Sequence, residues 1–198
     1  MFYKIIPALL LMGFSAVGQE PKMEWNPDHK ITIDDFKAPQ TTIGPAANAV
    51  HVQSGVGIEF ALQMNNIEFM FTKNFNPKVV CTFQKEAATL TAPDSLKAKQ
   101  LIHLIQYDYD LSELYTRKIR KELYENKKTF SNVTFFQPYY DKMIAERNAA
   151  SSKVYAETDF GTNTLLLEEE HKAVLKEIQK LSDYCKVCKP PKKGKKQE

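Results

Sequence analysis

The side chain of this chain that is best suited to chemistry is the carboxylate of Asp108, because it lies on the apolar face of a predicted helix. Side chains over Leu101–Leu123 recur at the helical repeat of about 100° per residue and form one apolar stripe. That stripe consists of Leu101, Leu104, Ile105, Leu111, Tyr115, Ile119 and Leu123. On the opposite side fall His103, Asp110, Arg117 and Lys121. We therefore expect the helix to bury the Asp108 carboxylate and to turn the His103 imidazole toward water.

A carboxylate among apolar neighbours needs a hydrogen-bonding partner or a raised pKa, since an unpaired buried charge is costly. We expect Asp108 to be paired with a donor such as a tyrosine hydroxyl, an arginine or a backbone N–H. One carboxylate could bind a metal ion, but a catalytic zinc needs about three protein donors and an open position for water. The helix by itself is therefore a poor metal site.

Two cysteines near the C-terminus, Cys185 and Cys188, form a second group. In an oxidising compartment they favour a disulfide, which leaves Cys81 as a small buried apolar residue. Redox catalysis is a weaker alternative, because a thioredoxin-type pair lies at the start of a helix, whereas this pair follows one and runs into KPPKKGKK. As a zinc site the pair supplies too few ligands by itself.

Strands are expected in the first half of the chain, where apolar and polar residues alternate. The segments are Ile31–Ile33, a strand or hairpin over 47–62 with a bend at Gly55 and Gly57, a run over 67–75 after an Asn65-Asn66 turn, and Val79–Phe83. His51 is expected at a polar strand position. Together these segments predict a small, mostly antiparallel sheet.

Helical periodicity begins after Pro93. The expected helices run from a cap at Asp94 or Ser95 to about Lys128, over Pro138–Ala156, and onward from a cap at Asn163 or Thr164. The aromatic residues Phe135, Phe136, Tyr139 and Tyr140 are interpreted as core packing, and residues 168–171 as a solvated first turn. The fold class is thus α+β, with a small sheet followed by three helices.

The central helix resembles that of a bacterial family of predicted secreted zinc-dependent proteases, also called domain of unknown function 922. Family members carry a sequence similar to LLRHEQGHFDIAELYARKLR, and its tail matches ELYTRKIR, residues 113–120, here. In that register the first zinc histidine of the family falls on Leu104, the catalytic glutamate on Ile105 and the second zinc histidine on Asp108. The HExxH motif of the family is therefore missing.

Two further segments carry the resemblance. The segment VYAETDFGTN, residues 154–163, is similar to the family phrase YDxETxHG, in which the histidine supplies the third zinc ligand; that position is Phe160 here. Near the N-terminus, Trp25 followed by Asp34-Asp35-Phe36 resembles a tryptophan followed by LTWDDFKG. The resemblance implies a zincin-like arrangement around a long central helix.

The substitutions decide what the resemblance implies for activity. Leu104 and Phe160 have no donor atoms and Ile105 cannot accept a proton, so we expect no cofactor where the family would hold zinc. Apolar side chains at these positions predict a filled cleft that gains burial and loses a desolvation penalty. We expect a pseudoenzyme that binds a protein or peptide partner, or acts as a scaffold.

The organisation of the chain fits an exported protein. Residues 1–18 combine an early lysine, an apolar run and small residues, which predicts a signal peptide cleaved before Gln19 and a periplasmic or secreted location. Residues 19–184 are expected to form a single zincin-like domain, since 198 residues with 43% hydrophobic content are enough for one core. Residues 185–198 contain the cysteine pair and a basic, disordered tail.

Partners are constrained only in part by the sequence. An exported chain is not expected to bind nucleic acid, and no segment after residue 18 has the ~20 apolar residues of a membrane span. The lysine-rich tail could also be attracted to an anionic envelope surface. The oligomeric state does not follow from the sequence.

Two classes of function stay open at this point. One is the catalytically silent binding protein. The other is a hydrolase with a metal site rebuilt around Asp108 from Glu157, Asp159, His51 or His171. A third, weaker possibility makes the pair Cys185 and Cys188 the active part. The first two differ in whether a base and about three donors converge on Asp108.

Overall fold

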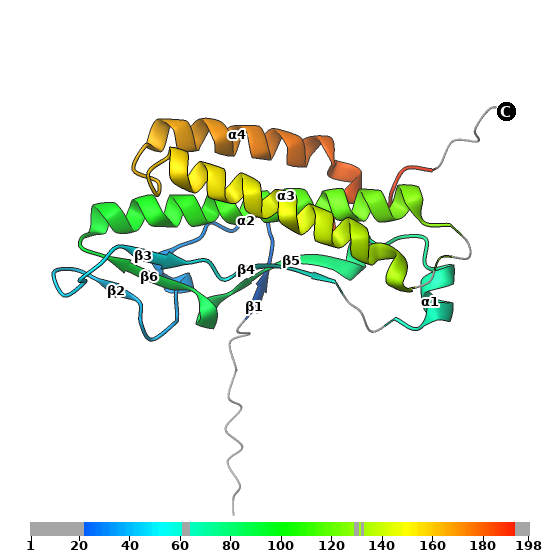
Figure 1. Ribbon diagram of the computed structural model, residues 1–198, viewed down its shortest axis with the longest axis horizontal. Coiled ribbons are helices and arrows are strands. Elements are labelled where there is room, and N and C mark those ends of the chain that lie inside the picture. The colour runs from blue at the N-terminus through cyan, green and yellow to red at the C-terminus, as the bar shows by residue number, and fades with distance from the viewer. Residues whose placement is uncertain (1–21, 61–63, 129–130, 132, 193–198) are drawn as a thin grey trace, which may run out of the picture.

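The computed structural model describes residues 22–60, 64–128, 131 and 133–192. Its architecture is α+β, with small sheets from the N-terminal part of the chain followed by long helices. Figure 1 shows the helix α2 (Ser95–Asn126) in the middle, the sheets on one side of it, and α3 (Gln137–Glu157) and α4 (Thr164–Lys180) on the other. The predicted order of a sheet followed by three helices is confirmed. The expected signal peptide and the end of the basic tail, 193–198, lie outside the described residues.

Within the described ranges, the strands form two sheets of three strands each rather than the one sheet expected. The first has the order β1 (Lys22–Glu24), β5 (Val79–Gln84) and β4 (Val56–Phe60), and both pairings are antiparallel. The second has the order β2 (Thr42–Ile43), β6 (Thr89–Ala92) and β3 (His51–Gln53). Here β2 runs parallel to β6, and β3 antiparallel to it. The predicted strand at Val79–Phe83 is confirmed as β5.

The predicted hairpin over residues 47–62 is wrong, because β3 and β4 belong to different sheets. The chain passes between the sheets at Gly55, where the Gln84 N–H donates to the Gly55 carbonyl (2.7 Å). A Cβ on Gly55 would lie 2.3 Å from the Gln84 carbonyl oxygen, so the close approach requires glycine. Gly57, in contrast, lies within β4 and marks no bend.

The predicted strand over residues 67–75 is also wrong. The helix α1 (Asn66–Phe71) begins there, and the Asn65 side chain caps it by accepting a hydrogen bond from the Glu68 N–H (2.8 Å). Alternation of apolar residues suggested one buried face, but only Phe69 of this helix is buried. The cap residue decided the local structure more strongly than the short alternating pattern.

The segment Ile31–Ile33 is not a strand either. A turn of 3-10 helix forms at Ile33–Asp35, where the buried Asp35 carboxylate accepts a hydrogen bond from the Thr32 N–H (2.9 Å). Asp35 also lies 2.9 Å from Lys85 Nζ and 3.2 Å from His29 Nε2. Burial raises the pKa of Asp35, but these partners lower it by more, so it lies below its usual range.

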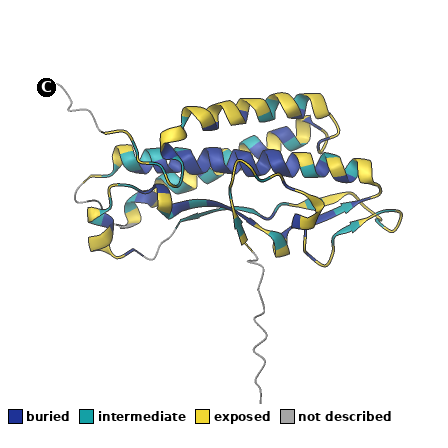
Figure 2. Ribbon diagram, turned by 180° about the vertical axis from the view of Figure 1, so that it is seen from behind, coloured by how far each residue is buried: buried dark blue, intermediate teal, exposed yellow. Residues whose placement is uncertain are grey.

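The helix α2 is buried on all sides along its middle. Asp94 caps it through the Lys97 N–H (2.8 Å), and every residue from 104 to 117 is buried, as the dark blue central stretch of Figure 2 shows. His103 is exposed as predicted. Asp110 and Arg117, which we expected to face water, are buried. The prediction failed because α4 and the segment around Trp25 cover the polar side of the helix.

The two long helices after α2 occur close to their predicted positions. The Asn163 side chain caps α4 through the Leu166 N–H (3.3 Å). The ring of Phe136 stacks on that of Phe60 at 4.2 Å, which confirms that aromatic side chains before α3 pack in the core. On α4, Leu165 and Leu175 are exposed. Within the described residues, no helix is both long and apolar enough to cross a bilayer.

Candidate functional site: a groove between β3 and α3

An open groove of about 630 Å³ lies between the strand β3 and the C-terminal half of α3. Its lining comes from His51–Gln53, Ser54, Val56, Asp108, Arg147, Ser151, Ser152, Tyr155, Ala156 and Phe160. We call this the β3–α3 groove. Asp108 and Phe160, two positions that the family resemblance singled out, therefore lie along one cavity.

Asp108 is paired by two side chains from α3. Its Oδ1 accepts a hydrogen bond from Ser151 Oγ (2.6 Å), and its Oδ2 forms an ion pair with Arg147 Nη2 (2.5 Å). Arg147 Nε also donates to Ser112 Oγ (3.0 Å), which in turn donates to the Asp108 carbonyl (2.8 Å). The expectation that Asp108 is buried and paired is confirmed, with the Ser151 hydroxyl as the hydrogen-bond donor and Arg147 as the ion-pair partner. Both oxygens of the carboxylate are engaged within the protein.

The positions Leu104 and Ile105 are fully buried and do not line the groove. Leu104 belongs to the core cluster that also contains Val154 of α3 and Leu167 of α4. Ile105 belongs to the second core cluster, which also contains Leu90 of β6. Both side chains are therefore core residues and form no part of the groove lining.

Phe160 does not fill the cleft, contrary to our expectation, because its side chain is 51% exposed. Asp159 and Phe160 both have a positive φ, of 46° and 48°, and Gly161 follows at 79°. A left-handed conformation costs a non-glycine residue roughly 1–2 kcal/mol. A Cβ on Gly161 would lie 2.7 Å from the Gln100 carbonyl oxygen, so the turn is pressed against α2. This strained turn places the Phe160 ring at the groove, edge-on to Tyr155 at 6.0 Å.

The other candidate metal donors are scattered. His51 lines the groove on β3 and is exposed, which confirms its polar strand position. Glu157 is exposed and 3.8 Å from Lys153 Nζ, and Asp159 is exposed in the turn. His171 binds Asp110 instead of facing water. In the described part of the chain no group of three or more His, Cys, Asp or Glu side chains could hold a metal ion.

Asp110 is a second buried carboxylate, and sequence reasoning missed its role. It accepts hydrogen bonds from Trp25 Nε1 (2.7 Å) and Gln106 Nε2 (3.0 Å), and His171 Nε2 lies 2.7 Å from its Oδ2. Burial raises the pKa of Asp110, but the hydrogen bonds from His171, Gln106 and Trp25 lower it by more, so it lies below its usual range. The single tryptophan of the chain was the only available signal for this contact.

A third group of charged side chains on α2 binds residues 181–188, which follow α4. We call residues 181–188 the C-terminal strap. Arg120 is fully buried, and its Nε and Nη2 donate to the Val79 carbonyl (2.9 and 2.6 Å). Its Nη1 donates to the Tyr184 carbonyl (2.9 Å). Glu113 Oε1 balances the charge, at 3.1 Å from Arg120 Nη1 and 2.8 Å from Arg117 Nε. These groups therefore have a structural role.

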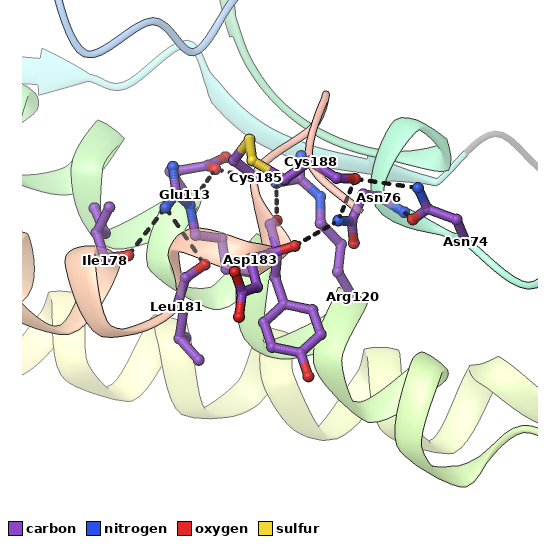
Figure 3. Close-up of a disulfide and its surroundings, with 11 residues drawn as sticks. Asn74, Asn76, Glu113, Arg120, Ile178, Leu181, Asp183, Cys185 and Cys188 are labelled. Atoms are coloured by element: carbon purple, nitrogen blue, oxygen red, sulfur yellow. Dashed lines mark hydrogen bonds and ion pairs between the residues drawn. A yellow bond between two sulfur atoms is a disulfide. The ribbon is translucent and has the colours of Figure 1, made fainter. Parts of the chain in front are cut away.

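The cysteines lie beside this group. Cys185 and Cys188 form a disulfide within the C-terminal strap, and the Cys188 carbonyl accepts hydrogen bonds from Asn74 Nδ2 (3.1 Å) and Asn76 Nδ2 (3.0 Å) (Figure 3). Cys81 is a free, buried thiol, and burial raises its pKa. A buried thiol that resists ionisation is a poor nucleophile.

Comparisons of the chain with known protein families, with characterised proteins and with solved structures found no match.

Proposed function

We propose that the protein is an exported, catalytically silent relative of zincin-like secreted metallopeptidases that binds an extended peptide in the β3–α3 groove. The main support for this proposal is that Asp108, which lines an open groove, already has both carboxylate oxygens engaged by Ser151 and Arg147. A carboxylate paired in this way stabilises the groove and is not free to activate water.

The border of the groove supports a peptide as the ligand. In the described part of the chain, β6 is the one strand that pairs with β3, so β3 is an edge of its sheet. An edge strand can add an extended peptide by backbone hydrogen bonds, with pockets beside it for alternate side chains. Val52, Tyr155 and Phe160 offer apolar contacts, and His51 and Ser152 offer polar ones.

The identity of the buried residues supports loss of catalysis. Leu104 and Ile105 have no donor atom and no basic atom, and both lie in the core instead of the groove. The family arrangement would need a metal ligand and a general base at these positions. The chain keeps the long helix and the groove without the groups that perform hydrolysis.

The proposal is tested by selecting binders from a phage-displayed library of random peptides. Enriched peptides should bind the wild-type protein, and Ser152→Trp, which fills the groove from α3, should weaken binding by at least about tenfold. Lys172→Trp adds the same side chain at an exposed site on α4 outside the groove and serves as the matched control. No enrichment, or equal binding by Ser152→Trp, would contradict the proposal.

The second candidate is a hydrolase with a rebuilt metal site, favoured by one observation. His51 and Asp108 line the same groove, so an imidazole and a carboxylate lie along one cavity. For this function Asp108 would have to give up its contacts with Arg147 and Ser151. We therefore rank it below the peptide-binding function.

A further inference from the structure

The short helix α1 exposes two large apolar side chains at one end of the molecule. Ile67 is 68% exposed and Phe71 is 77% exposed, and their spacing of four residues places both on one face of the helix. Figure 1 shows α1 at one extremity of the molecule, beyond the sheets, and Figure 2 shows the exposed residues of this extremity in yellow. Two large apolar groups exposed side by side lose the free energy that burial would give. We therefore interpret this face of α1 as a contact surface for a binding partner.

The exposed face is held firmly in this orientation. Phe69, on the opposite face of α1, is buried at 1% exposure and packs against Phe75 at 5.2 Å. Lys127 from the end of α2 donates to the Met70 carbonyl (2.9 Å), and its ammonium lies 5.4 Å from the centre of the Phe69 ring. Ile67 and Phe71 therefore point outward from a helix that is fixed on its inner side.

A groove of about 580 Å³ begins beside Phe71. Its apolar floor is formed by Met70, Phe75 and Leu123, and Lys73 and Lys128 lie at its edge. Both of these lysines are exposed. We call α1, this groove and the two lysines the α1 tip.

The charge around the α1 tip is basic. Glu68, on α1 itself, lies 3.1 Å from Lys78 Nζ, and Glu125 of α2 lies 3.9 Å from Lys121 Nζ, so both carboxylates have a lysine partner. Tyr124, which also lines the groove, donates its hydroxyl hydrogen to the Pro191 carbonyl. Lys192 follows, and the sequence continues with Lys193, Lys195 and Lys196. Pro191 therefore lies beside the α1 tip, with the exposed Lys192 next to it.

We propose that the α1 tip docks on the surface of an anionic lipid bilayer. Ile67 and Phe71 enter the boundary between headgroups and acyl chains, while Lys73, Lys128 and Lys192 attract the headgroups. Apolar insertion combined with a basic patch gives a reversible peripheral attachment, in which each signal alone is weak.

The chemistry favours a bilayer over an acidic protein. The cations at the tip are lysines, which act as point charges without fixed directional geometry, whereas planar recognition of carboxylates favours arginine. The apolar residues project from the surface, so a protein partner would need a matching cavity. A fluid bilayer accommodates such a projection without one.

Co-sedimentation with lipid vesicles tests the proposal. The chain from Gln19, which lacks the apolar N-terminal segment, is mixed with phosphatidylcholine vesicles that contain about a third phosphatidylglycerol, or none. We expect binding to the anionic vesicles, weakened at high salt, and at least about tenfold weaker binding to the neutral ones. Equal binding to both, or to neither, overturns the proposal.

Two matched variants identify the surface. Ile67→Ser with Phe71→Ser should weaken vesicle binding by at least about tenfold, whereas Leu165→Ser with Leu175→Ser, two exposed apolar residues of α4, should change it by less than about twofold. Circular dichroism checks that both variants stay folded. If the α1 variant binds vesicles as the wild type does, the docking surface lies elsewhere. Soluble polyglutamate serves as a model of an acidic polypeptide. The bilayer proposal fails if polyglutamate binds the wild type as tightly as the anionic vesicles do, and if the α1 variant weakens both kinds of binding by the same factor. In that case the partner is an acidic polypeptide.

Discussion

At the scale of single residues, the charged side chains of α2 act through partners that are distant in sequence. Ser151 donates a hydrogen bond to Asp108, 43 positions away, and Trp25 donates one to Asp110, 85 positions away. Each buried carboxylate has donors at its oxygens, which is what keeps a charge stable inside a protein. The polar residues in the middle of α2 thereby hold the covering segments in place.

Replacement of Arg147 by methionine tests the pairing of Asp108. Arg147→Met leaves the carboxylate with Ser151 as its remaining side-chain donor, so we expect the free energy of unfolding to fall by about 2–4 kcal/mol. Urea unfolding measures the change. Asp108→Asn combined with Arg147→Met should lose less than the sum of the single variants, because the uncompensated charge is gone. A loss below about 0.5 kcal/mol for Arg147→Met would show that the ion pair is unimportant.

The Asp110 group predicts a stability loss in acid. The folded-state pKa of Asp110 lies below its usual value, so the stabilisation is present above the unfolded-state pKa of about 3.9 and is lost as pH falls through the lower folded-state pKa. Stability measured by urea unfolding should decrease below about pH 4, and less steeply in Asp110→Asn. Because Trp25 donates directly to Asp110, its fluorescence should report the same transition. Identical acid slopes in both proteins would contradict this account.

At the scale of elements, the sequence predicted the long helices and failed on the short ones. The sequence located α2 and α4 to within a few residues, because each helix has several turns of regular periodicity and a capping residue, Asp94 or Asn163. The segments at Ile31–Ile33 and 67–75 are too short for periodicity to decide, and Asp35 and Asn65 set their structure by local hydrogen bonds.

The candidate site was predictable only in part. The register on α2 pointed to Asp108, and the phrase at 154–163 pointed to Phe160, and these two do share a groove. Arg147 and Ser151 carried no signal, because their role depends on how α3 crosses α2. The exposure of Phe160 depends on the left-handed turn, which the sequence does not reveal.

The C-terminal strap allows two kinds of anchor to be compared. The disulfide closes a loop of only a few residues, so Cys185→Ser with Cys188→Ser should cost about 2 kcal/mol or less. Arg120→Met leaves the Val79 and Tyr184 carbonyls without this buried donor and leaves Glu113 with Arg117 as its remaining partner, and should cost about 3–5 kcal/mol. Thermal or urea unfolding compares the two variants. A larger loss for the cysteine variant would mean that the disulfide is the main anchor.

At the scale of the whole molecule, one helix organises two surfaces with different properties. The middle of α2 supplies Asp108 to the β3–α3 groove. The last turns of α2 supply Leu123 and Tyr124 to the groove beside α1, and the residues that follow the helix supply Lys127 and Lys128. The groove has a paired charge at its floor and an edge strand along its border. The α1 tip has exposed apolar groups and lysines. A protein held at a membrane by the tip would leave the groove free to bind a peptide.

The most direct test of the account is the zinc content of the chain from Gln19 after loading with zinc and desalting, measured by elemental analysis. Asp108→Ala removes the groove carboxylate, and Asp110→Asn is the matched control that removes a buried carboxylate away from the groove. Because Arg147 and Ser151 engage Asp108, we predict less than about 0.1 zinc per chain in all three proteins. One zinc per chain in the wild type and in Asp110→Asn, lost in Asp108→Ala, would contradict the account and establish a rebuilt metal site.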